Sequence, residues 1–472
     1  MSISSPLAPE LPVQLSDELL RRFDAPGPRY TSYPTADRFV EAFGAADCLR
    51  ALSQRGPGAA VANQGLLSVY VHVPFCESVC YYCACNKVIT KHHERAHEYL
   101  DALERELQLV VAAVGSGRAV SQLHFGGGSP TFLTDAQLAR LMDALQSAFQ
   151  LTAAAEVSIE IDPRTVNAER LEHLRQIGFN RISFGVQDFD AAVQQAVHRI
   201  QPFEQVQALM QDARRLGFES INVDLIYGLP RQTPESFART VAQVSGLRPD
   251  RIALYAYAHL PQRFKPQRRI VTEDLPSPQQ RVAMLGGAIA GFIARGYNYI
   301  GMDHFALPYD SLAVAKRQGR LHRNFQGYSV RPDGDLIGLG VSAIGRVGPT
   351  YYQNAKTLPE YYDALRQGQL PVVRGIALSR DDLVRRAVIM GLMCQGHVDF
   401  EAIELAHLID MRAYFAEELT QLAAMQAAGL VEIEPGAIRV TAAGWFLVRA
   451  VAAVFDRHLR SDQQREQFSR VI

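Results

Sequence analysis

Six short apolar runs, separated by helical patterns, constrain the fold of this chain more than any other feature. Each run is rich in β-branched and aromatic residues, as is typical of strands buried on both faces of a parallel sheet. After Thr134, a residue suited to cap a helix, Leu138, Leu141 and Leu145 recur at spacings of three and four. The six runs are LLSVYVHVPF (66–75), QLHFGG (122–127), EVSIEID (156–162), RISFGVQ (181–187), INVDLIYG (221–228) and RIALYAY (251–257).

Three glycines mark a weak internal repeat. Gly178, Gly217 and Gly296 each follow a helical pattern and precede an apolar run, at intervals of one and two periods of about 40 residues. We expect each glycine to end its helix in a left-handed conformation. Right-handed crossovers make the strands of such β–α units parallel. The sequence therefore predicts an α/β fold, a partial (β/α)6 barrel, with a doubly wound open sheet as the rival.

Unusual residues follow five of the six runs. They are Cys76 to Cys85, Gly126-Gly127-Gly128, Asp162, Gln187 and Tyr257-Ala258-His259. In a barrel, the loops at the carboxyl ends of the strands carry the chemistry. We therefore expect these residues to share one rim of the barrel.

The chain divides into three predicted parts: an N-terminal arm (1–60), the barrel with an extension (61–365), and a mostly α-helical C-terminal domain with a small β-hairpin (366–472). Three prolines between Ala25 and Thr35 disfavour helix, so this irregular arm is expected to be extended and to lie on another part. Helices near 380–395, 400–409 and 412–428 precede two alternating strands at 430–441, an order that resembles a winged helix. The segment has no basic stripe, so we expect a lid or a wall rather than a DNA-binding surface.

Composition excludes several function classes. Lys+Arg 48 and Asp+Glu 49 give a net charge of -1, which does not favour nucleic acid or anionic lipid as a partner. The longest apolar stretch, Val282 to Ala294, has 13 residues, whereas about 18 are needed to span a bilayer. The N-terminus lacks the basic start and apolar core of a signal peptide, so a cytoplasmic location is expected. Six cysteines are too few for a disulfide scaffold.

Four of these cysteines, Cys76, Cys80, Cys83 and Cys85, fall within ten residues. Structural zinc usually takes its ligands from two separated segments, and a redox dithiol would leave two of the four unexplained. An iron–sulfur cluster accepts closely spaced thiolates because its irons occupy separate corners. With three thiolate ligands, the fourth iron stays open for a substrate. The spacing does not tell which three cysteines are ligands, and zinc and a dithiol stay as weaker alternatives.

The motifs around these positions resemble those of a known family. Cys76-x3-Cys80-x2-Cys83, with an aromatic residue before the last cysteine, is similar to the motif of radical S-adenosylmethionine (SAM) enzymes. The longer segments resemble the oxygen-independent coproporphyrinogen III dehydrogenases (oxidases) of heme biosynthesis, over most of the chain. These segments are YVHVPFCESVCYYCACNKVIT, GGGSPTFL, IEIDPR, ISFGVQDF, VDLIYGLPRQTPESF, YAHLPQRF, GMDHFA, LHRNFQGYS and GLGVSAIG.

The resemblance implies a reaction and its cofactors. Cys76, Cys80 and Cys83 would hold a [4Fe-4S] cluster, and Cys85 would not be a ligand. An electron from the cluster would cleave SAM to a 5'-deoxyadenosyl radical, which would remove hydrogen from the β-carbon of a propionate. Loss of carbon dioxide and of an electron would leave a vinyl group. Two propionates of coproporphyrinogen III would react in turn to give protoporphyrinogen IX.

The resemblance also implies two bound SAM molecules and their contacts. Catalytic roles would fall to Cys85, Tyr70 and Glu160. The glycines let backbone amides come close to a ligand, and buried carboxylates need a specific partner. The first SAM would contact Tyr70, Gly127, Glu160 and Ile344, and the second Tyr82, Gly128, Ser129, Gln187, Arg199, Asp224 and Ala258.

Individual residues give less support for the predicted substrate contacts and partners. Coproporphyrinogen III carries four carboxylates, for which Arg29 and Arg323 are the candidate contacts. We expect the arm to fold over the barrel mouth and exclude water, so that deletion of residues 1–35 keeps the cluster but abolishes decarboxylation. An electron donor such as a flavodoxin or ferredoxin is expected, and the chain is expected to be a monomer. A heme chaperone and a radical SAM methyltransferase of the same superfamily are the alternative functions.

Overall fold

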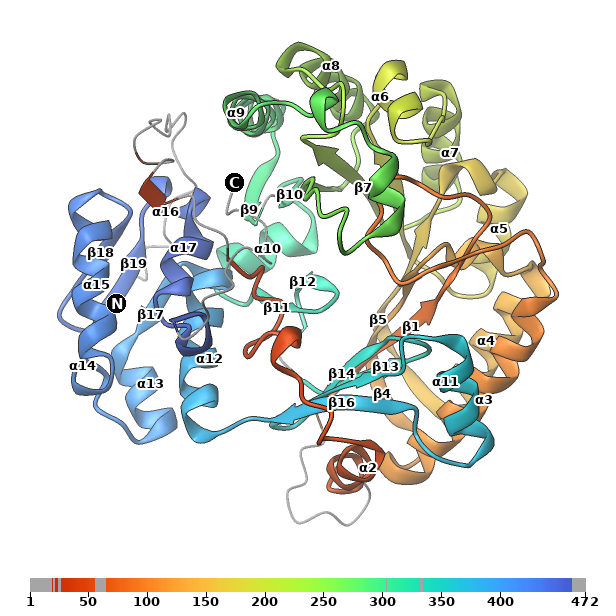
Figure 1. The fold of residues 1–472 in the computed structure, drawn as a ribbon, viewed down its shortest axis with the longest axis horizontal. Helices are drawn as coiled ribbons and strands as arrows, with labels where there is room; N and C mark the ends of the chain where they lie inside the picture. The colour runs from red at the N-terminus through yellow and green to blue at the C-terminus, as the bar shows by residue number, and fades with distance from the viewer. Residues whose placement is uncertain are drawn as a thin grey trace.

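The predicted runs form six neighbouring strands of one curved sheet. The computed structural model describes residues 19, 22–23, 27–55, 65–302, 304–331 and 334–460. All neighbours among the six strands pair in parallel, and the sheet curves into an incomplete barrel (Figure 1). The predicted partial (β/α)6 barrel is therefore confirmed. The six strands are, in order, β1 (Leu67–Val73), β4 (Arg118–Gly127), β5 (Phe149–Ile161), β6 (Arg181–Gln187), β7 (Ser220–Tyr227) and β8 (Arg251–Ala256).

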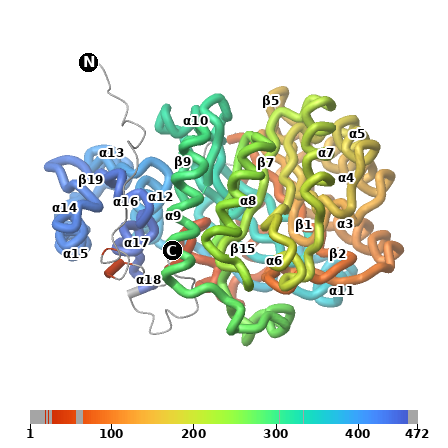
Figure 2. The backbone as a smooth tube through the Cα atoms, turned by 90° about the horizontal axis from the view of Figure 1, so that it is seen from above, coloured from red at the N-terminus to blue at the C-terminus, as the bar shows by residue number. Residues whose placement is uncertain are grey.

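Helices cover the outer face of this sheet (Figures 1 and 2). Thr134 caps α4 as predicted, because its Oγ1 accepts the Gln137 amide at 3.3 Å. Gly178, Gly217 and Gly296 have φ angles of 108°, 78° and 87°, which confirms the expected left-handed helix ends. The outer helices are α3 (Arg95–Val114), α4 (Asp135–Ala148), α5 (Ala168–Gln176), α6 (Ala191–Ala196), α7 (Phe203–Arg215), α8 (Pro234–Leu247) and α9 (Pro278–Ala294).

Within the described residues, the sheet continues past the six strands at both edges and reaches twelve strands. Beyond β8 lie β10 (His304–Ala306) and β9 (Asn298–Gly301), both antiparallel to their neighbours. On the other side, β13 (Leu336–Leu339) pairs with β1 in parallel. Three antiparallel strands follow it: β14 (Ile344–Val347), β15 (Thr350–Asn354) and β16 (Val372–Ala377). These edge strands have three to six residues, too few for a periodic pattern, so the sequence did not indicate them.

The apolar runs predicted strands buried on both faces, and the inner of these two faces is polar. Along β6, Ile182, Phe184 and Val186 are buried in the hydrophobic core, whereas the residues that alternate with them line cavities inside the barrel. Successive side chains of a strand point to opposite faces, so one face meets the helices and the other the interior. The inward polar residues include Gln122, His124, Glu156, Ser158, Glu160, Arg181, Ser183, Asn222 and Asp224.

Smaller elements connect the sheet edges. The pair β2 (Phe75–Cys76) and β3 (Val88–Ile89) encloses the cysteines, and the hairpin β11 (His322–Asn324) and β12 (Gly327–Ser329) lies between the barrel and the C-terminal helices (Figure 1). Two further helices are α10 (Ser311–Arg317) and α11 (Leu358–Arg366).

The C-terminal part is mostly helical, as predicted, and stands at one side of the barrel (Figures 1 and 2). The predicted hairpin is β18 with β19, and an unexpected strand, β17, extends it to three strands. The elements are α12 (Arg380–Gln395), β17 (His397–Asp399), α13 (Phe400–His407), α14 (Met411–Tyr414), α15 (Ala416–Ala427), β18 (Val431–Ile433), β19 (Ala437–Val440), α16 (Ala442–Phe446), α17 (Val448–Ala453) and α18 (Arg457–Arg460).

The N-terminal arm, in its described residues, contacts both the C-terminal part and the sheet. Tyr30 and Tyr33 are buried, and Tyr30 Oη donates to Asp456 Oδ2 at 3.1 Å. Val40 forms an isolated bridge with Gly375 of β16. A short helix, α2 (Ala45–Ser53), stands where the sequence indicated irregular structure. The arm therefore joins two parts of the molecule.

In the described part of the chain, none of the helices combines the length and the apolar character that crossing a membrane would require.

Candidate active site

A cavity of about 500 Å³ lies at the carboxyl ends of β1 and β4 to β8. The loop that follows β1, the glycine turn after β4 and the ends of β5, β6 and β7 form its walls. The expectation that the unusual residues share one rim is met for most of them. The cavity lining includes the predicted residues Cys76, Cys80, Tyr82, Cys83, Cys85, Gly127, Gly128, Ser129, Glu160, Gln187, Arg199 and Asp224.

The cysteine loop, residues 76–87, is held at both ends. Cys76 ends β2, and β3 returns beside it, with the Thr90 amide donating to the Cys76 carbonyl at 2.9 Å. Within the loop, the Cys83 amide donates to the Cys80 carbonyl at 3.2 Å. The Lys87 ammonium donates to the Cys83 carbonyl at 3.0 Å. These bonds keep the cysteines in one compact segment that opens into the cavity.

Side chains from other elements donate to two of the thiol sulfurs. Ser129 Oγ lies 3.7 Å from Cys76 Sγ, and Arg164 Nη2 and Arg199 Nη1 lie 3.6 and 3.4 Å from Cys80 Sγ. Hydrogen bonds to sulfur help to set the properties of iron–sulfur clusters. Three thiols of one loop that share a cavity with such donors are a suitable set for a [4Fe-4S] cluster. Within the described ranges, no group of three or more His, Cys, Asp or Glu side chains is arranged to hold a single metal ion.

Cys85 differs from the other three cysteines of the loop. The Cys85 thiol is hydrogen-bonded to Cys83, and this bond, more than the nearby Lys87, lowers the pKa of Cys83 to about 6. The same contact raises the pKa of Cys85. Cys85 thus acts as a donor toward its neighbour, and it is the most exposed thiol of the loop.

Arg199 is buried and ties the cysteine loop to the barrel wall. Its Nη1 donates to Asp162 Oδ2 at 3.1 Å and its Nη2 to the Gly185 carbonyl at 2.6 Å. Burial would raise the pKa of Asp162, but the charges of Arg199 and Arg164 hold it below its usual range. Because Asp162, Gly185 and Cys80 occupy most of its N–H groups, little of Arg199 is free for a ligand carboxylate.

Glu160 approaches the glycine turn from β5. Its Oε2 accepts the Gly127 amide at 3.2 Å, and its Oε1 lies 3.4 Å from His124 Nε2. Burial alone would raise the pKa of Glu160, but the hydrogen bond and charge of His124 and the Gly127 amide lower it. Gly127 has a φ of 114°, and a Cβ there would lie 2.5 Å from the His72 ring. Only glycine fits between this ring and the carboxylate.

Asp224 of β7 lies deeper in the barrel. Ser183 Oγ donates to its Oδ2 at 2.8 Å and Asn222 Nδ2 to its Oδ1 at 2.9 Å. Burial, followed by the negative charge of Glu160, raises the pKa of Asp224 to about 6. Two carboxylates with opposite pKa shifts therefore face the same cavity.

Three predicted residues, Tyr70, Ala258 and Ile344, do not appear in the cavity lining. Tyr70 stacks on His124 with ring centroids 5.8 Å apart, and its Oη lies 3.1 Å from His72 Nδ1, so it supports the Glu160 surroundings. Ala258 follows β8, where its carbonyl accepts Gln267 Nε2 at 3.1 Å. Ile344 begins β14, at the edge of the barrel beside β13. The structure thus brings the first two near the site and leaves Ile344 farther along the sheet.

Several residues of the site were not singled out from the sequence. His124 and Ser183 contact the two carboxylates, and Tyr255 borders the cavity. Arg164 and Lys87 belong to the same site, because they contact the cysteine loop. A signal was present for the strand residues: His124 and Ser183 stand at alternate positions to apolar residues of their runs. Such alternation indicates a strand with one polar face.

Comparison with known proteins gives a consistent result. The family model of the Radical SAM superfamily matches residues 70–244, and that of the HemN C-terminal domain matches residues 378–447. The chain is 50% identical to the oxygen-independent coproporphyrinogen III oxidase of Escherichia coli over 454 residues, which cover 96% of this chain and 98% of that protein. The corresponding oxidase of Pseudomonas aeruginosa is 50% identical over 458 residues, with 96% and 98% covered. That of Synechocystis is 42% identical over 464 residues, with 98% of both chains covered.

A solved structure agrees with these matches. Coproporphyrinogen III oxidase (HemN) from Escherichia coli, described as a radical SAM enzyme, superimposes with a TM-score of 0.87 and 49% identity, over 91% of this chain and 97% of that chain. The similarity extends across the barrel, the cysteine loop and the C-terminal part alike. Near full-length identity of this degree shows that the chain belongs to the oxygen-independent coproporphyrinogen III oxidase family, within the radical SAM superfamily.

Proposed function

We propose that this chain catalyses the oxygen-independent oxidative decarboxylation of two propionate side chains of coproporphyrinogen III to vinyl groups, which yields protoporphyrinogen IX. The observation that carries the proposal is the opening of the thiols of Cys76, Cys80 and Cys83 into the cavity that also contains Glu160 and Asp224. A substrate in this cavity would meet both the cofactor-binding loop and the polar interior of the barrel.

The cofactors of this family are a [4Fe-4S] cluster and SAM, and two SAM molecules are part of the proposal. When bound, they supply a radical that removes a hydrogen atom from the propionate β-carbon. The residues of the chain bind the cofactors and the substrate and orient them. Glu160, ionised because its pKa is lowered, accepts a hydrogen bond from an amino or hydroxyl group of the nucleotide. The glycine turn of Gly127 and Gly128 lets the backbone come close to it.

Catalytic roles are proposed for Cys85, Tyr70 and Glu160. Cys85 is the thiol that the cluster does not need, and it is exposed toward the cavity next to Cys83. A thiol that donates to its neighbour can hold or deliver a proton close to the reacting group. Tyr70 acts through His124 and His72, and therefore positions Glu160 and the glycine turn.

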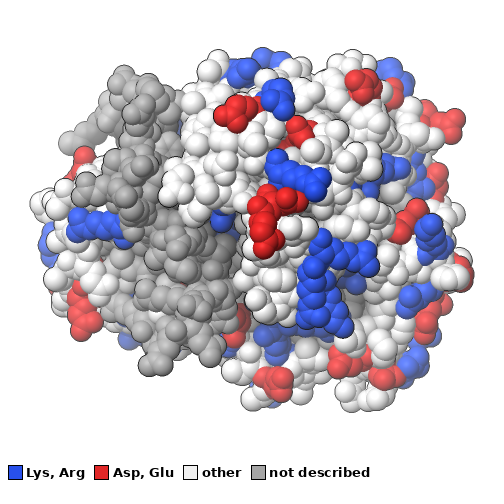
Figure 3. Space-filling view, turned by 45° about the horizontal axis from the view of Figure 1, so that its top comes forward, with Lys and Arg blue, Asp and Glu red and all other residues white. Residues whose placement is uncertain are grey.

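The electron donor in this proposal is a small acidic redox protein such as a flavodoxin or ferredoxin. The basic segment, residues 263–269, exposes Arg263, Lys265, Arg268 and Arg269. It is attached to the cysteine loop, because Gln267 Nε2 donates to the Tyr82 carbonyl at 3.0 Å. In the face shown in Figure 3, a group of basic side chains stands near the middle, with acidic ones beside it. A positive surface beside a cofactor loop favours the encounter with an acidic partner. Monomeric state and cytoplasmic location stay predictions.

The test is an anaerobic incubation of the reconstituted holoenzyme with SAM, a reductant and coproporphyrinogen III, followed by mass spectrometry of the porphyrin product. The expected product has lost two carboxyl groups as carbon dioxide, together with one hydrogen atom and one electron for each. A methylated product would instead support the methyltransferase alternative. An unchanged substrate, combined with tight heme binding, would support the chaperone alternative.

A further inference from the structure

Three aromatic rings inside the barrel form a row that ends in a guanidinium group at each side. The row consists of Tyr255 of β8, His304 of β10 and Tyr328 of β12. The Tyr255 and His304 centroids are 5.9 Å apart, those of His304 and Tyr328 are 5.4 Å apart, and both pairs meet edge to face. The Arg29 guanidinium lies 5.4 Å from the Tyr255 ring centroid, and that of Arg323 lies 4.6 Å from the Tyr328 centroid.

The two arginines come from parts of the chain that are far apart in sequence. Arg29 belongs to the arm, and Arg323 faces Tyr328 across the β11–β12 hairpin. Both charges act on the same imidazole: burial, then Arg323 and later Arg29, lower the pKa of His304 to about 3. His304 therefore stays neutral and cannot serve as a third cation. Both charges also act on Tyr255.

Neither guanidinium has an anionic partner among the described residues. Arg323 is only 5% exposed, yet its Nε and Nη1 form no hydrogen bond. Arg29 has no ion pair within the described part of the chain. Glu160 and Asp224, the acids whose charges act on Tyr255, are already engaged by His124, Gly127, Ser183 and Asn222. Burying a cation without a partner is costly, so this site is suited to an anion that arrives with the ligand.

The row lies beside the active-site cavity. Tyr255 borders both that cavity and a second one of about 160 Å³, which His304 and Tyr328 also line. The two cavities share Glu160, Ser183 and Asp224 as well. A ligand whose reacting group lies near the cysteine loop can therefore extend past Tyr255 into the second cavity, along the row of rings that the two arginines flank.

We propose that Arg29 and Arg323, one at each end of the row, bind the carboxylates of the substrate that are retained in the product, while Tyr255, His304 and Tyr328 pack against the macrocycle. This rests on the proposed function, in which two of four propionates react and two remain. The reacting propionates must lie near Glu160 and the cysteine loop. The carboxylates on the opposite side of the macrocycle then face the arginines, where a guanidinium can bind them in a bidentate manner.

The experiment is a fluorescence titration of the full-chain holoenzyme, without SAM, with two porphyrins. Coproporphyrin III carries all four propionates, whereas deuteroporphyrin IX carries hydrogen in place of the two that react and keeps the other two. For both R29Q and R323Q we expect the Kd of both porphyrins to rise about tenfold or more. The control R215Q, which removes an exposed ion pair with Asp212 on α7, is expected to leave both Kd values unchanged.

Each other outcome overturns the proposal. Unchanged Kd values for both porphyrins show that the arginines do not bind the ligand. A loss confined to coproporphyrin III assigns them to a reacting propionate instead. Because Arg323 is buried, R323Q can disturb the packing, whereas R29Q replaces a less buried residue. A folded R29Q with unchanged Kd values for both porphyrins therefore also overturns the proposal. Failure of the proposed function is a different result: the wild-type holoenzyme would then remove no carboxyl group from coproporphyrinogen III.

Discussion

At the scale of single residues, hydrogen bonds to sulfur distinguish the three proposed cluster ligands from Cys85. Cys76 and Cys80 accept from Ser129, Arg164 and Arg199, and Cys83 accepts from Cys85. Cys85 donates instead. The spacing of the cysteines contains none of this information, because the donors come from distant parts of the sequence.

Replacing Cys83 and Cys85 one at a time tests this division. We expect Cys83→Ala to prevent cluster formation, because a ligand is lost. Cys85→Ala should retain the cluster and lose decarboxylation by roughly 100-fold or more, because a proton-handling group is lost. Iron content and visible absorption after anaerobic reconstitution measure the first effect, and product formation the second. A Cys85→Ala protein without iron, or a Cys83→Ala protein with full iron content, would contradict the assignment.

The glycine turn makes a prediction about stability. Gly127 and Gly178 have similar φ angles, 114° and 108°, but a Cβ would lie 2.5 Å from the His72 ring at Gly127 and no closer than 3.7 Å to any atom at Gly178. Both alanine variants should lose about 1 kcal/mol from the left-handed backbone. Gly127→Ala should lose a further ~1–3 kcal/mol through overpacking. Chemical unfolding measures both, and equal losses would show that the His72 ring moves away freely.

At the scale of elements, a buried carboxylate joins an outer helix to the edge of the sheet. Glu106 of α3 is 1% exposed and accepts from the Gly340 amide at 2.7 Å, Asn354 Nδ2 at 2.6 Å and Tyr361 Oη at 2.6 Å. These partners lie next to β13, in β15 and in α11. Burial outweighs the three hydrogen bonds and raises the pKa of Glu106 to about 7.

This raised pKa gives stability a defined pH dependence. The folded state holds the Glu106 proton up to about pH 7, whereas the unfolded chain releases it near 4.5, so the folded state binds more protons between these values. Stability is therefore highest below the unfolded pKa and falls as pH rises through about 7, by ~2–3 kcal/mol. In Glu106→Gln this contribution should be absent. Unfolding midpoints of both proteins from pH 5 to 8 measure the difference, and parallel curves would contradict it.

The basic segment predicts how the rate of cluster reduction depends on the charge of residues 263–269. Replacing Arg263, Lys265 and Arg268 by glutamate should slow cluster reduction by a flavodoxin about tenfold or more at low salt, because electrostatic attraction speeds the encounter. Reduction by dithionite, a small molecule, should be unchanged and serves as the control. Stopped-flow absorbance follows both reactions. Equal flavodoxin rates in the two proteins would place the donor surface elsewhere.

Local patterns predicted the elements that local interactions specify. The six parallel strands, the Thr134 cap and the glycine-terminated helices follow from spacing within short windows. The strands β9, β10 and β13 to β16 did not, because their pairing depends on neighbours that are distant in sequence. The cysteine loop was predicted from the spacing of its cysteines, and Glu160 from the family resemblance of its segment. The row from Tyr255 to Tyr328 was not predicted, because its rings come from three separate strands.

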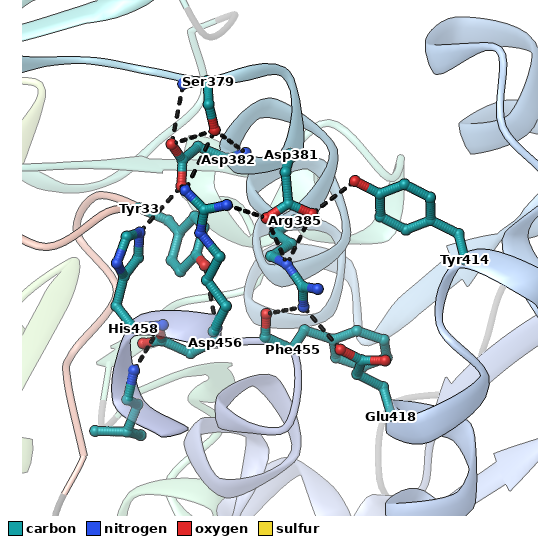
Figure 4. A network of polar contacts seen from close by, with 12 residues as sticks. Tyr33, Ser379, Asp381, Asp382, Arg385, Tyr414, Glu418, Phe455, Asp456 and His458 are labelled. Carbon is teal, nitrogen blue, oxygen red and sulfur yellow. Dashed lines mark hydrogen bonds and ion pairs between the residues drawn. The ribbon is translucent and has the colours of Figure 1, made fainter. Parts of the chain in front are cut away.

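At the scale of the whole molecule, the arm and the C-terminal part are joined by buried polar contacts. Tyr33 lies in a network that includes Ser379, Asp382 and His458 (Figure 4). The Arg457 amide donates to Tyr33 Oη at 3.3 Å, and His458 Nε2 lies 3.0 Å from Asp382 Oδ1. The arm that carries Arg29 into the barrel is therefore held in place from outside the barrel.

Removal of the Tyr30 hydroxyl tests the connection between the arm and the C-terminal part. Tyr30→Phe removes the donor to Asp456 and should lower the free energy of unfolding by ~1–2 kcal/mol, because it leaves a buried carboxylate less satisfied. Tyr309→Phe removes a similar bond to Asp250, 2.9 Å long, on an exposed ring and should change it by less than about 0.5 kcal/mol. Thermal unfolding compares the two variants. Equal effects would show that the Tyr30 bond contributes no more than a surface contact.

The bond between Tyr30 and Asp456 spans 426 positions of the chain. During synthesis, the arm leaves the ribosome early, and although Val40 can pair with Gly375 once β16 has been made, Tyr30 has no partner until residue 456 has followed. By then all the strands of the barrel have been synthesised, but Tyr30 of the arm has not yet docked. The contact between Tyr30 and Asp456 is therefore a late one, and a chain released before residue 456 lacks this support for its arm.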